Sequence, residues 1–265
     1  MRRAAALLGA AHPGPAFAVT VLAGMLGVAV GLGPADVALV VAAVLTGQLS
    51  IGWSNDLVDA ARDRAVGRRD KPLATGDLDE RVVRVACGLA LVATVPLSLL
   101  CGLVAGPVQL LTVASGWAYN LGLKSTAWSW APYAVAFGAL PAFVALVDRP
   151  SELPPWWMVV AGALLGVGAH LVNVLPDLAD DAATGVRGLP HRLGARRSSV
   201  LAAAVLVGAT VVIVLGATVD PALAAAALVV VGGLAVVALV TDGRTPFRAA
   251  IGMALVDVAM LVVAG

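Results

Sequence analysis

The chain has 265 residues, of which 60% are hydrophobic and only 12% are charged, and its formal net charge is +1. Soluble globular domains carry roughly twice that fraction of charged residues, and here the apolar residues form long blocks rather than short core-sized runs. The composition therefore excludes a soluble domain and predicts an integral membrane protein.

The N-terminal segment is basic and reads MRRAAALLGAAHPGP. It resembles the start of a signal peptide, but Pro13 and Pro15 interrupt it and a further apolar run follows. We therefore interpret it as a cytoplasmic lead-in to the first membrane span rather than as a cleaved leader.

Apolar stretches long enough to cross a bilayer follow one another along the rest of the chain. They lie at about residues 14–33, 36–54, 82–104, 106–122, 129–147, 156–175, 198–217, 221–240 and 247–264. The sequence therefore predicts an all-α membrane protein with nine transmembrane helices, forming a single domain over residues 1–265.

The basic residues of the connections gather on one side of the membrane. If the nine spans alternate in direction, Arg149 alone among the 17 Lys and Arg residues falls on the opposite side. Because positive residues mark the cytoplasmic side, we expect the N-terminus and the long loops inside the cell and the C-terminus outside. We also expect this multi-pass protein to lie in the plasma membrane.

The second span is followed at once by three carboxylates in the stretch SNDLVDAARD, residues 54–63. On a helix that turns about 100° per residue, Asp56, Asp59 and Asp63 project from one stripe. We therefore expect three acids on one face at the cytoplasmic end of this span.

The sixth span is followed by a similar group in the stretch NVLPDLADD, residues 173–181. Asp177 and Asp181 are one helical turn apart, and Asn173 lies one turn farther into the membrane. Asp180 comes three residues after Asp177 and can share the same face. The matching positions of the two acidic groups favour an internal repeat of a four-helix unit, followed by a final helix.

Acids at helix ends can simply be solvated, or paired with nearby arginines. Two clusters with matching spacing argue against that interpretation, because grouped carboxylates repel one another and need compensating positive charge. Mg²⁺ takes one or two carboxylates and leaves its other positions for water and phosphate oxygens. Together with nearby Lys and Arg residues, the two clusters predict a site for a diphosphate bridged through Mg²⁺.

Four stretches of the cytoplasmic loops match motifs of one family. NDLVDAARD fits NDxxDxxxD, DLADD fits DxxxD, RRDKPLATGDL resembles (K/R)PLx(S/T)G, and TGVRGLPHRLG resembles GxxTLPxRLG. With these motifs after the second and sixth spans, the whole chain resembles the UbiA superfamily of intramembrane prenyltransferases. The resemblance implies a helical bundle around a central cavity, with Mg²⁺ holding the diphosphate of a polyprenyl donor between the two acidic motifs.

The resemblance also suggests roles for individual residues. The implied metal ligands are Asp56, Asp59, Asp63, Asp177 and Asp181. The candidate catalytic residues are Asp56, Asp59, Asp177, Asp181 and Lys124. The candidate substrate-binding residues are Asn55, Arg68, Lys71, Tyr119, Lys124, Asn173, Asp180, Arg192 and His170. The implied partners are a polyprenyl diphosphate, a lipophilic acceptor and membrane lipid, and we expect no nucleic-acid partner.

Three positions depart from the family pattern. Lys71 stands where relatives often have Arg, and Gly188 replaces the threonine of the TLP segment. Tyr119 and Lys124 are one residue farther apart than in the family's YxxxK motif. Lys124 is still the only basic residue of its loop, and we keep it as a diphosphate contact.

Two ionisable residues lie inside predicted spans. His170 falls on the same stripe as Asn173 and Asp177, where it either contacts an acceptor or is an ordinary buried histidine satisfied by a neighbour. Asp257 lies within the ninth span, where an ionisable group is energetically unfavourable. It either serves a function or makes a polar contact between helices.

The leading hypothesis is the transfer of a prenyl group through an allylic cation to an acceptor. An alternative on the same scaffold is a terpene cyclase, which acts on a prenyl diphosphate without an acceptor. An ion-coupled transporter is less consistent, because its acids are expected near the membrane midplane. A CDP-alcohol phosphotransferase would carry its acids in one DGxxAR…GxxxDxxxD block, which this sequence lacks.

Overall fold

The computed structural model describes residues 2–178, 181, 185–241 and 244–264, and every regular element within them is a helix. The helices are α1 (Arg2–Gly9), α2 (Pro13–Ala29), α3 (Pro34–Ala65), α4 (Pro72–Thr75), α5 (Glu80–Leu100), α6 (Ala105–Leu121), η1 (Leu123–Ser125), α7 (Ala131–Asp148), α8 (Trp156–Val174), η2 (Leu175–Asp177), α10 (Leu189–Leu193), α11 (Ala195–Gly216), α12 (Pro221–Val240) and α13 (Thr245–Ala264).

The long helices coincide with the predicted spans. Within the described residues, nine helices have 17 or more residues, and each overlaps one predicted span. Seven of them are long and apolar enough to cross a membrane, and α2 becomes an eighth when it is joined to α1, from which it is bent by 68°. The all-helical membrane fold is therefore confirmed, while length and composition establish seven or eight of the nine spans in this part of the chain.

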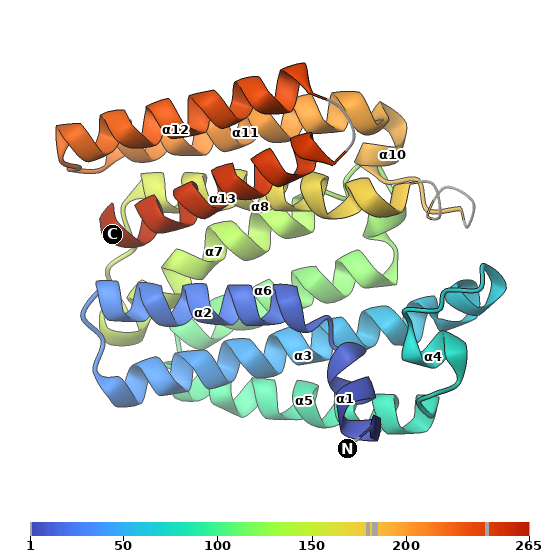
Figure 1. Cartoon of the computed structure of the whole chain (residues 1–265). Coiled ribbons are helices and arrows are strands. Elements are labelled where there is room, and N and C mark those ends of the chain that lie inside the picture. Colours follow the sequence, from blue (N-terminus) through green and yellow to red (C-terminus); the bar gives the residue numbers. More distant parts are fainter. Residues whose placement is uncertain (1, 179–180, 182–184, 242–243, 265) are drawn as a thin grey trace.

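The long helices pack side by side in a bundle (Figure 1). α3 packs against α2, α5 and α6, and α8 packs against α7, α11 and α13, while α6 joins α7. Glycines allow the closest of these contacts: a Cβ on Gly162 of α8 would lie 2.5 Å from the carbonyl oxygen of Phe137 on α7. Small residues at helix contacts are typical of membrane bundles, in which close packing drives association.

Asp257 joins two helices inside the bundle. Thr210 Oγ1 of α11 donates to Asp257 Oδ1 of α13 at 2.5 Å, and both side chains are buried. This contact supports the second interpretation of Asp257, a polar link between helices.

The C-terminal end of α3, α4 and α10 lie at one end of the bundle, at the right of Figure 1, and the C-terminal end of α13 lies at the other end. α3 continues past residue 54, the predicted end of its span, to Ala65. All of the first motif is therefore helical. α4 follows α3 closely and packs on it, while η2 contacts α8 and α11.

Candidate active site

The three carboxylates of the first motif lie on a buried face of α3. Asp56, Asp59 and Asp63 are 1%, 8% and 8% exposed, although they stand within about the last three turns of the helix. Their spacing correctly predicted a shared face. Because a buried charge is stable only when it is paired and hydrogen-bonded, the partners of these carboxylates define the site.

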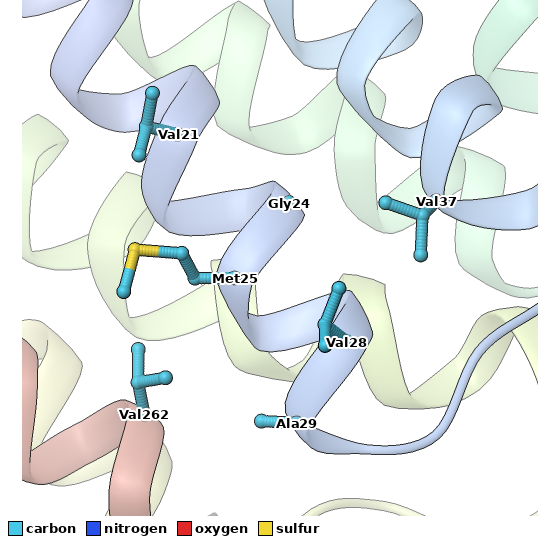
Figure 2. Close-up of a pocket in the computed structure, with 7 residues that line it drawn as sticks. All are labelled: Val21, Gly24, Met25, Val28, Ala29, Val37 and Val262. Atoms are coloured by element: carbon cyan, nitrogen blue, oxygen red, sulfur yellow. The ribbon is translucent and has the colours of Figure 1, made fainter. Parts of the chain in front are cut away.

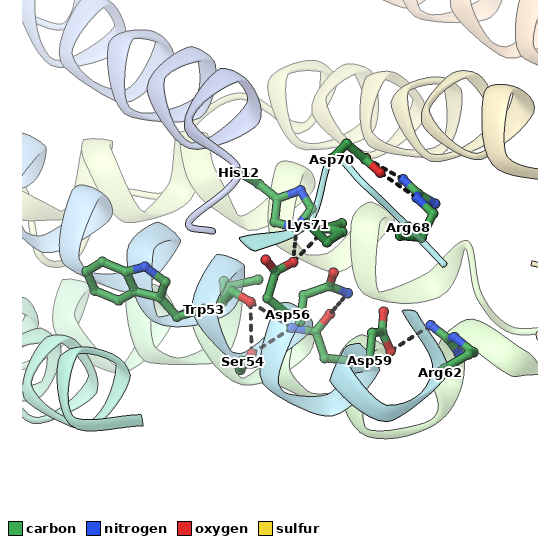
Figure 3. Close-up of polar contacts among 12 residues, drawn as sticks. His12, Trp53, Ser54, Asp56, Asp59, Arg62, Arg68, Asp70 and Lys71 are labelled. Carbon is green, nitrogen blue, oxygen red and sulfur yellow. Dashed lines mark hydrogen bonds and ion pairs between the residues drawn. The ribbon is translucent and has the colours of Figure 1, made fainter. Parts of the chain in front are cut away.

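Basic side chains from three segments hold the first two carboxylates. Lys71 Nζ, in the loop after α3, donates to Asp56 Oδ1 at 2.6 Å, and Lys124 Nζ of η1 donates to Asp59 Oδ1 at 2.5 Å. Arg62 pairs with the same Asp59 oxygen at 2.6 Å (Figure 3). Burial lowers the pKa of the Lys124 ammonium, although Asp59 acts in the opposite direction.

His12 also reaches the first motif. Its Nε2 atom lies 2.8 Å from Asp56 Oδ1 and 2.9 Å from Lys71 Nζ (Figure 3). His12 forms the break between α1 and α2 and has φ 52, the one left-handed non-glycine residue in the described chain. Gly52 of α3 makes room for this break, because a Cβ there would overlap the carbonyl oxygen of Ala11.

Asn55 links the first motif to α6. Its Nδ2 donates to Asn120 Oδ1 at 3.2 Å, and Asn120 Nδ2 in turn donates to Ser54 Oγ at 2.7 Å. Asn55, a candidate substrate-binding residue, is thus hydrogen-bonded to the neighbouring helix α6 and helps to fix the position of α3 against it.

Three aromatic rings lie together between α6, α7 and α8. The rings of Tyr119 and Tyr133 are 5.3 Å apart, and the His170 ring lies 5.7 Å from the first and 5.0 Å from the second. The Tyr133 hydroxyl forms a hydrogen bond with the side chain of Asn173. Tyr119 of α6 therefore joins His170 and Asn173, which the sequence already placed on one stripe of α8, in a single cluster.

The second motif faces the same end of the bundle as the first. Arg68 Nη1 lies 3.5 Å from Asp177 Oδ1, so a residue of the first loop pairs with an acid of the second. Two hydrogen bonds of 2.8 Å from Arg68 to Asp70 lower the pKa of that carboxyl to about 2. Asp180 lies outside the described residues.

Asp181 is close enough to the first motif to be affected by its charges. Burial raises the pKa of the Asp181 carboxyl, and the negative charges of Asp177 and Asp59 raise it further. His191 and Arg62 act in the opposite direction and lower this pKa. His191 Nε2 is 3.4 Å from Asp181 Oδ2. The fold therefore brings the two acidic motifs within electrostatic range of each other.

Arg192 is not brought to the acidic motifs. It is exposed, and its Nε atom donates to the carbonyl oxygen of Arg187 at 3.1 Å. The preceding residue, His191, points toward Asp181 instead. Two further contacts of the first motif, His12 and Arg62, were not predicted from the sequence. Arg62 carried a signal there, since it stands three residues after Asp59.

The donor set fits Mg²⁺. No group of three or more His, Cys, Asp or Glu side chains converges on one point among the described residues. Mg²⁺ does not require such a cage, because it uses one or two carboxylates and keeps water and phosphate oxygens as its other ligands. Asp56 Oδ2 is buried and has no hydrogen-bond partner, which is the kind of oxygen that a cation would satisfy.

An apolar groove lies elsewhere on the bundle. It has a volume of about 460 Å³ and lies between α2, α3 and α13 (Figure 2). Its lining consists of Val21, Gly24, Met25, Val28, Ala29, Val37 and Val262. Val37 is about 28 Å from Asp56 along α3, at 1.5 Å per residue. This groove therefore adds no chemical group to the acidic site.

A curated relative and several solved structures are similar to this chain. The bacteriochlorophyll synthase 33 kDa chain of Cereibacter sphaeroides is 32% identical over 186 residues, which cover 64% of this chain and 60% of that protein. The chain thus matches less than two thirds of that relative's length. An apo structure of a UbiA homolog from Aeropyrum pernix K1 has a TM-score of 0.73 and 18% identity, over 92% of this chain and 97% of that one.

The second structure is a UbiA homolog from Archaeoglobus fulgidus bound to GPP and Mg²⁺. Its TM-score is 0.69 at 13% identity, over 98% of this chain and 100% of that one. At such identities the likeness shows a shared fold. The model of the UbiA prenyltransferase family matches residues 17–259, nearly the whole sequence, and the chain therefore belongs to the UbiA prenyltransferase family.

Proposed function

We propose that this protein transfers a prenyl group from a polyprenyl diphosphate to a lipophilic acceptor, with Mg²⁺ between the diphosphate and the carboxylates. The observation that carries the proposal is the pairing of Arg68, in the loop after the first motif, with Asp177 of the second motif, which joins two regions far apart in the chain. Two relatives support it: the homolog bound to GPP and Mg²⁺, and the synthase from C. sphaeroides.

The donor diphosphate occupies the space between the two motifs in this proposal. The carboxylates of Asp56, Asp59, Asp63, Asp177 and Asp181 would hold the metal, and Lys71, Lys124 and Arg68 would contact the phosphates directly. When bound, Mg²⁺ supplies positive charge that stabilises the departing diphosphate. Lys71, Lys124 and Arg68 already lie against carboxylates of the two motifs, so each could donate to a phosphate oxygen of a diphosphate held there.

The reaction breaks the bond between the allylic carbon and the diphosphate oxygen, and the diphosphate leaves with the bonding electrons. The acceptor then forms the new bond to the allylic carbon and releases a proton. The apolar bundle around Tyr119, His170 and Asn173 limits access of water to the cation. We place the acceptor beside these residues, and we assign Asn55 and Asp180 to the polar surroundings of the donor.

The products distinguish transfer from cyclisation. Purified protein is incubated with Mg²⁺ and labelled prenyl diphosphates of several lengths, with and without a membrane extract, and the products are identified by mass. We expect a prenylated lipid that forms only with the extract. A hydrocarbon formed without the extract would identify a cyclase instead. Release of diphosphate under neither condition, from correctly folded protein, would contradict the proposal.

We also propose that the acidic end of the bundle faces the cytoplasm and that the protein lies in the plasma membrane. Val66, beside the first motif, and Leu103, between α5 and α6, are both exposed. Single cysteines at these positions, in a variant without Cys87 and Cys101, report the orientation in intact cells. We expect an impermeant maleimide to label position 103 and not position 66. Labelling with the opposite preference would reverse the proposed topology.

A further inference from the structure

Ser129 lies where three functional segments meet. It stands between η1 and α7 and is 0% exposed. Its Oγ atom is 3.0 Å from His170 Nε2 on α8 and accepts a hydrogen bond of 2.9 Å from the backbone N–H of Leu189, the first residue of α10. One hydroxyl group therefore connects the Lys124 loop, α8 and the segment that follows the second acidic motif.

The contact between the two loops is unusually close. A Cβ on Gly188 would lie 2.6 Å from the carbonyl oxygen of Lys124 and 2.9 Å from Ser129 Oγ. The backbone φ of −64° at position 188 is open to any residue. Close packing, and not backbone conformation, therefore requires glycine there. The first N–H of α10 would have no partner within its own helix, and Ser129 supplies that partner from the opposite loop.

This contact is tied to residues of the proposed diphosphate site on both sides. The backbone N–H of Val186 donates to the carbonyl oxygen of Asp181 at 2.9 Å, and His191 of α10 lies 3.4 Å from the Asp181 carboxylate. On the other side, Lys124 holds Asp59. The contact of Leu189 with Ser129 therefore belongs to the series of contacts that connects Asp181 with the Lys124 loop.

We infer that Ser129 is a positioning residue, which holds the second acidic motif at its working distance from Lys124, and that His170 orients its hydroxyl. A serine hydroxyl has one proton to donate. Ser129 Oγ accepts from Leu189, and in this inference it donates its own proton to His170 Nε2, 3.0 Å away. His170 is 1% exposed and acts through Ser129. This inference rests on the proposed function, because the separation matters only if both motifs share one ligand.

Ser129→Ala in the full-length protein tests the inference without requiring turnover. Hydrogen exchange of the segment 186–193 measures how firmly Leu189 is held, and thermal protection by magnesium pyrophosphate measures the diphosphate site. We expect faster exchange in the segment. We also expect the concentration of magnesium pyrophosphate for half-maximal protection to rise about tenfold, as for loss of one buried hydrogen bond.

Ser198→Ala is a matched control. Ser198 is also 0% exposed and its hydroxyl also contacts α10, donating to the carbonyl oxygen of Pro190 at 3.2 Å. That oxygen keeps a second hydrogen bond from the N–H of Gly194, so the control should retain wild-type protection. If Ser129→Ala does not fold, Ser129→Cys replaces the hydroxyl with a slightly larger thiol that is a weaker acceptor, and the same rise is expected.

The outcomes separate the inference from the proposed function. If magnesium pyrophosphate does not protect the wild-type protein against heat, the proposed diphosphate site is wrong, and so is the positioning role of Ser129. Equal protection of wild type and Ser129→Ala would overturn the positioning role alone, as would an equal loss in Ser198→Ala.

The role of His170 has its own test. His170→Leu should weaken protection like Ser129→Ala, His170→Gln should restore part of it, and the double variant Ser129→Ala/His170→Leu should be no worse than Ser129→Ala. A double variant that is clearly worse would show that His170 acts independently of Ser129.

Discussion

Asp59→Asn and Asp181→Asn should each abolish most turnover, with losses of about 100-fold or more, as when one electrostatic contact to a developing charge is removed. Each substitution keeps the size of the side chain and removes one charge. Asp59 holds Lys124 and Arg62, and Asp181 lies within the electrostatic range of Asp59. If both carboxylates hold metal on opposite sides of one diphosphate, neither motif suffices alone.

The double variant Asp59→Asn/Asp181→Asn should therefore be little worse than either single variant, because residues that act as a unit are not additive. Rates with a labelled prenyl diphosphate measure this. Asp77→Asn is the control, since Asp77 belongs to the same loop region but is exposed and bonded to Thr75. Near-normal rates for Asp181→Asn beside an inactive Asp59→Asn would show that the second motif is only a solvated helix end.

Removal of divalent cations should stop the reaction completely. A diphosphate cannot approach the carboxylates of Asp56, Asp59, Asp63 and Asp181 without a bridging cation, because like charges at close range repel strongly. Dialysis against EDTA should reduce turnover to background, and Mg²⁺ or Mn²⁺ should restore it. Ca²⁺ should restore less, since it prefers more oxygen ligands at longer distances.

The control for this experiment is EDTA that has been saturated with Mg²⁺, which keeps the ionic conditions but leaves no chelating capacity. Circular dichroism should show the same helix content in all samples, because packing of the spans does not involve the metal. Full turnover in an excess of free EDTA would rule out the proposed cation bridge.

The sequence alone determined the long helices and the shared face of the first three acids of the candidate site. Each predicted span has its counterpart among the described helices, because the length of an apolar block is a local property that the bilayer itself demands. The shared face of Asp56, Asp59 and Asp63 also followed from helical periodicity, which needs no knowledge of the neighbouring helices.

The partners of those acids were not predictable in the same way. His12 was overlooked because its contact with Asp56 depends on a break between α1 and α2 and on the space above Gly52. Arg192 was selected from its place in a motif, yet it turns toward Arg187 while His191 faces Asp181. Neighbouring residues on a short helix point in different directions, and only the docking of α10 decides which of them enters the site.

At Gly188, too, the sequence shows a feature whose cause is visible only in the tertiary structure. The sequence revealed a missing threonine, and the tertiary structure supplies the reason: a Cβ there would overlap the carbonyl oxygen of Lys124, while the hydroxyl of Ser129 bonds the next backbone N–H. Hydropathy and periodicity depend on residues that are close together in the chain, so the sequence specified the long helices, their faces and the family. Contacts such as Ser129 with Leu189 or Arg68 with Asp177 join distant segments. Their geometry depends on how closely whole helices pack, and only the folded bundle decides it.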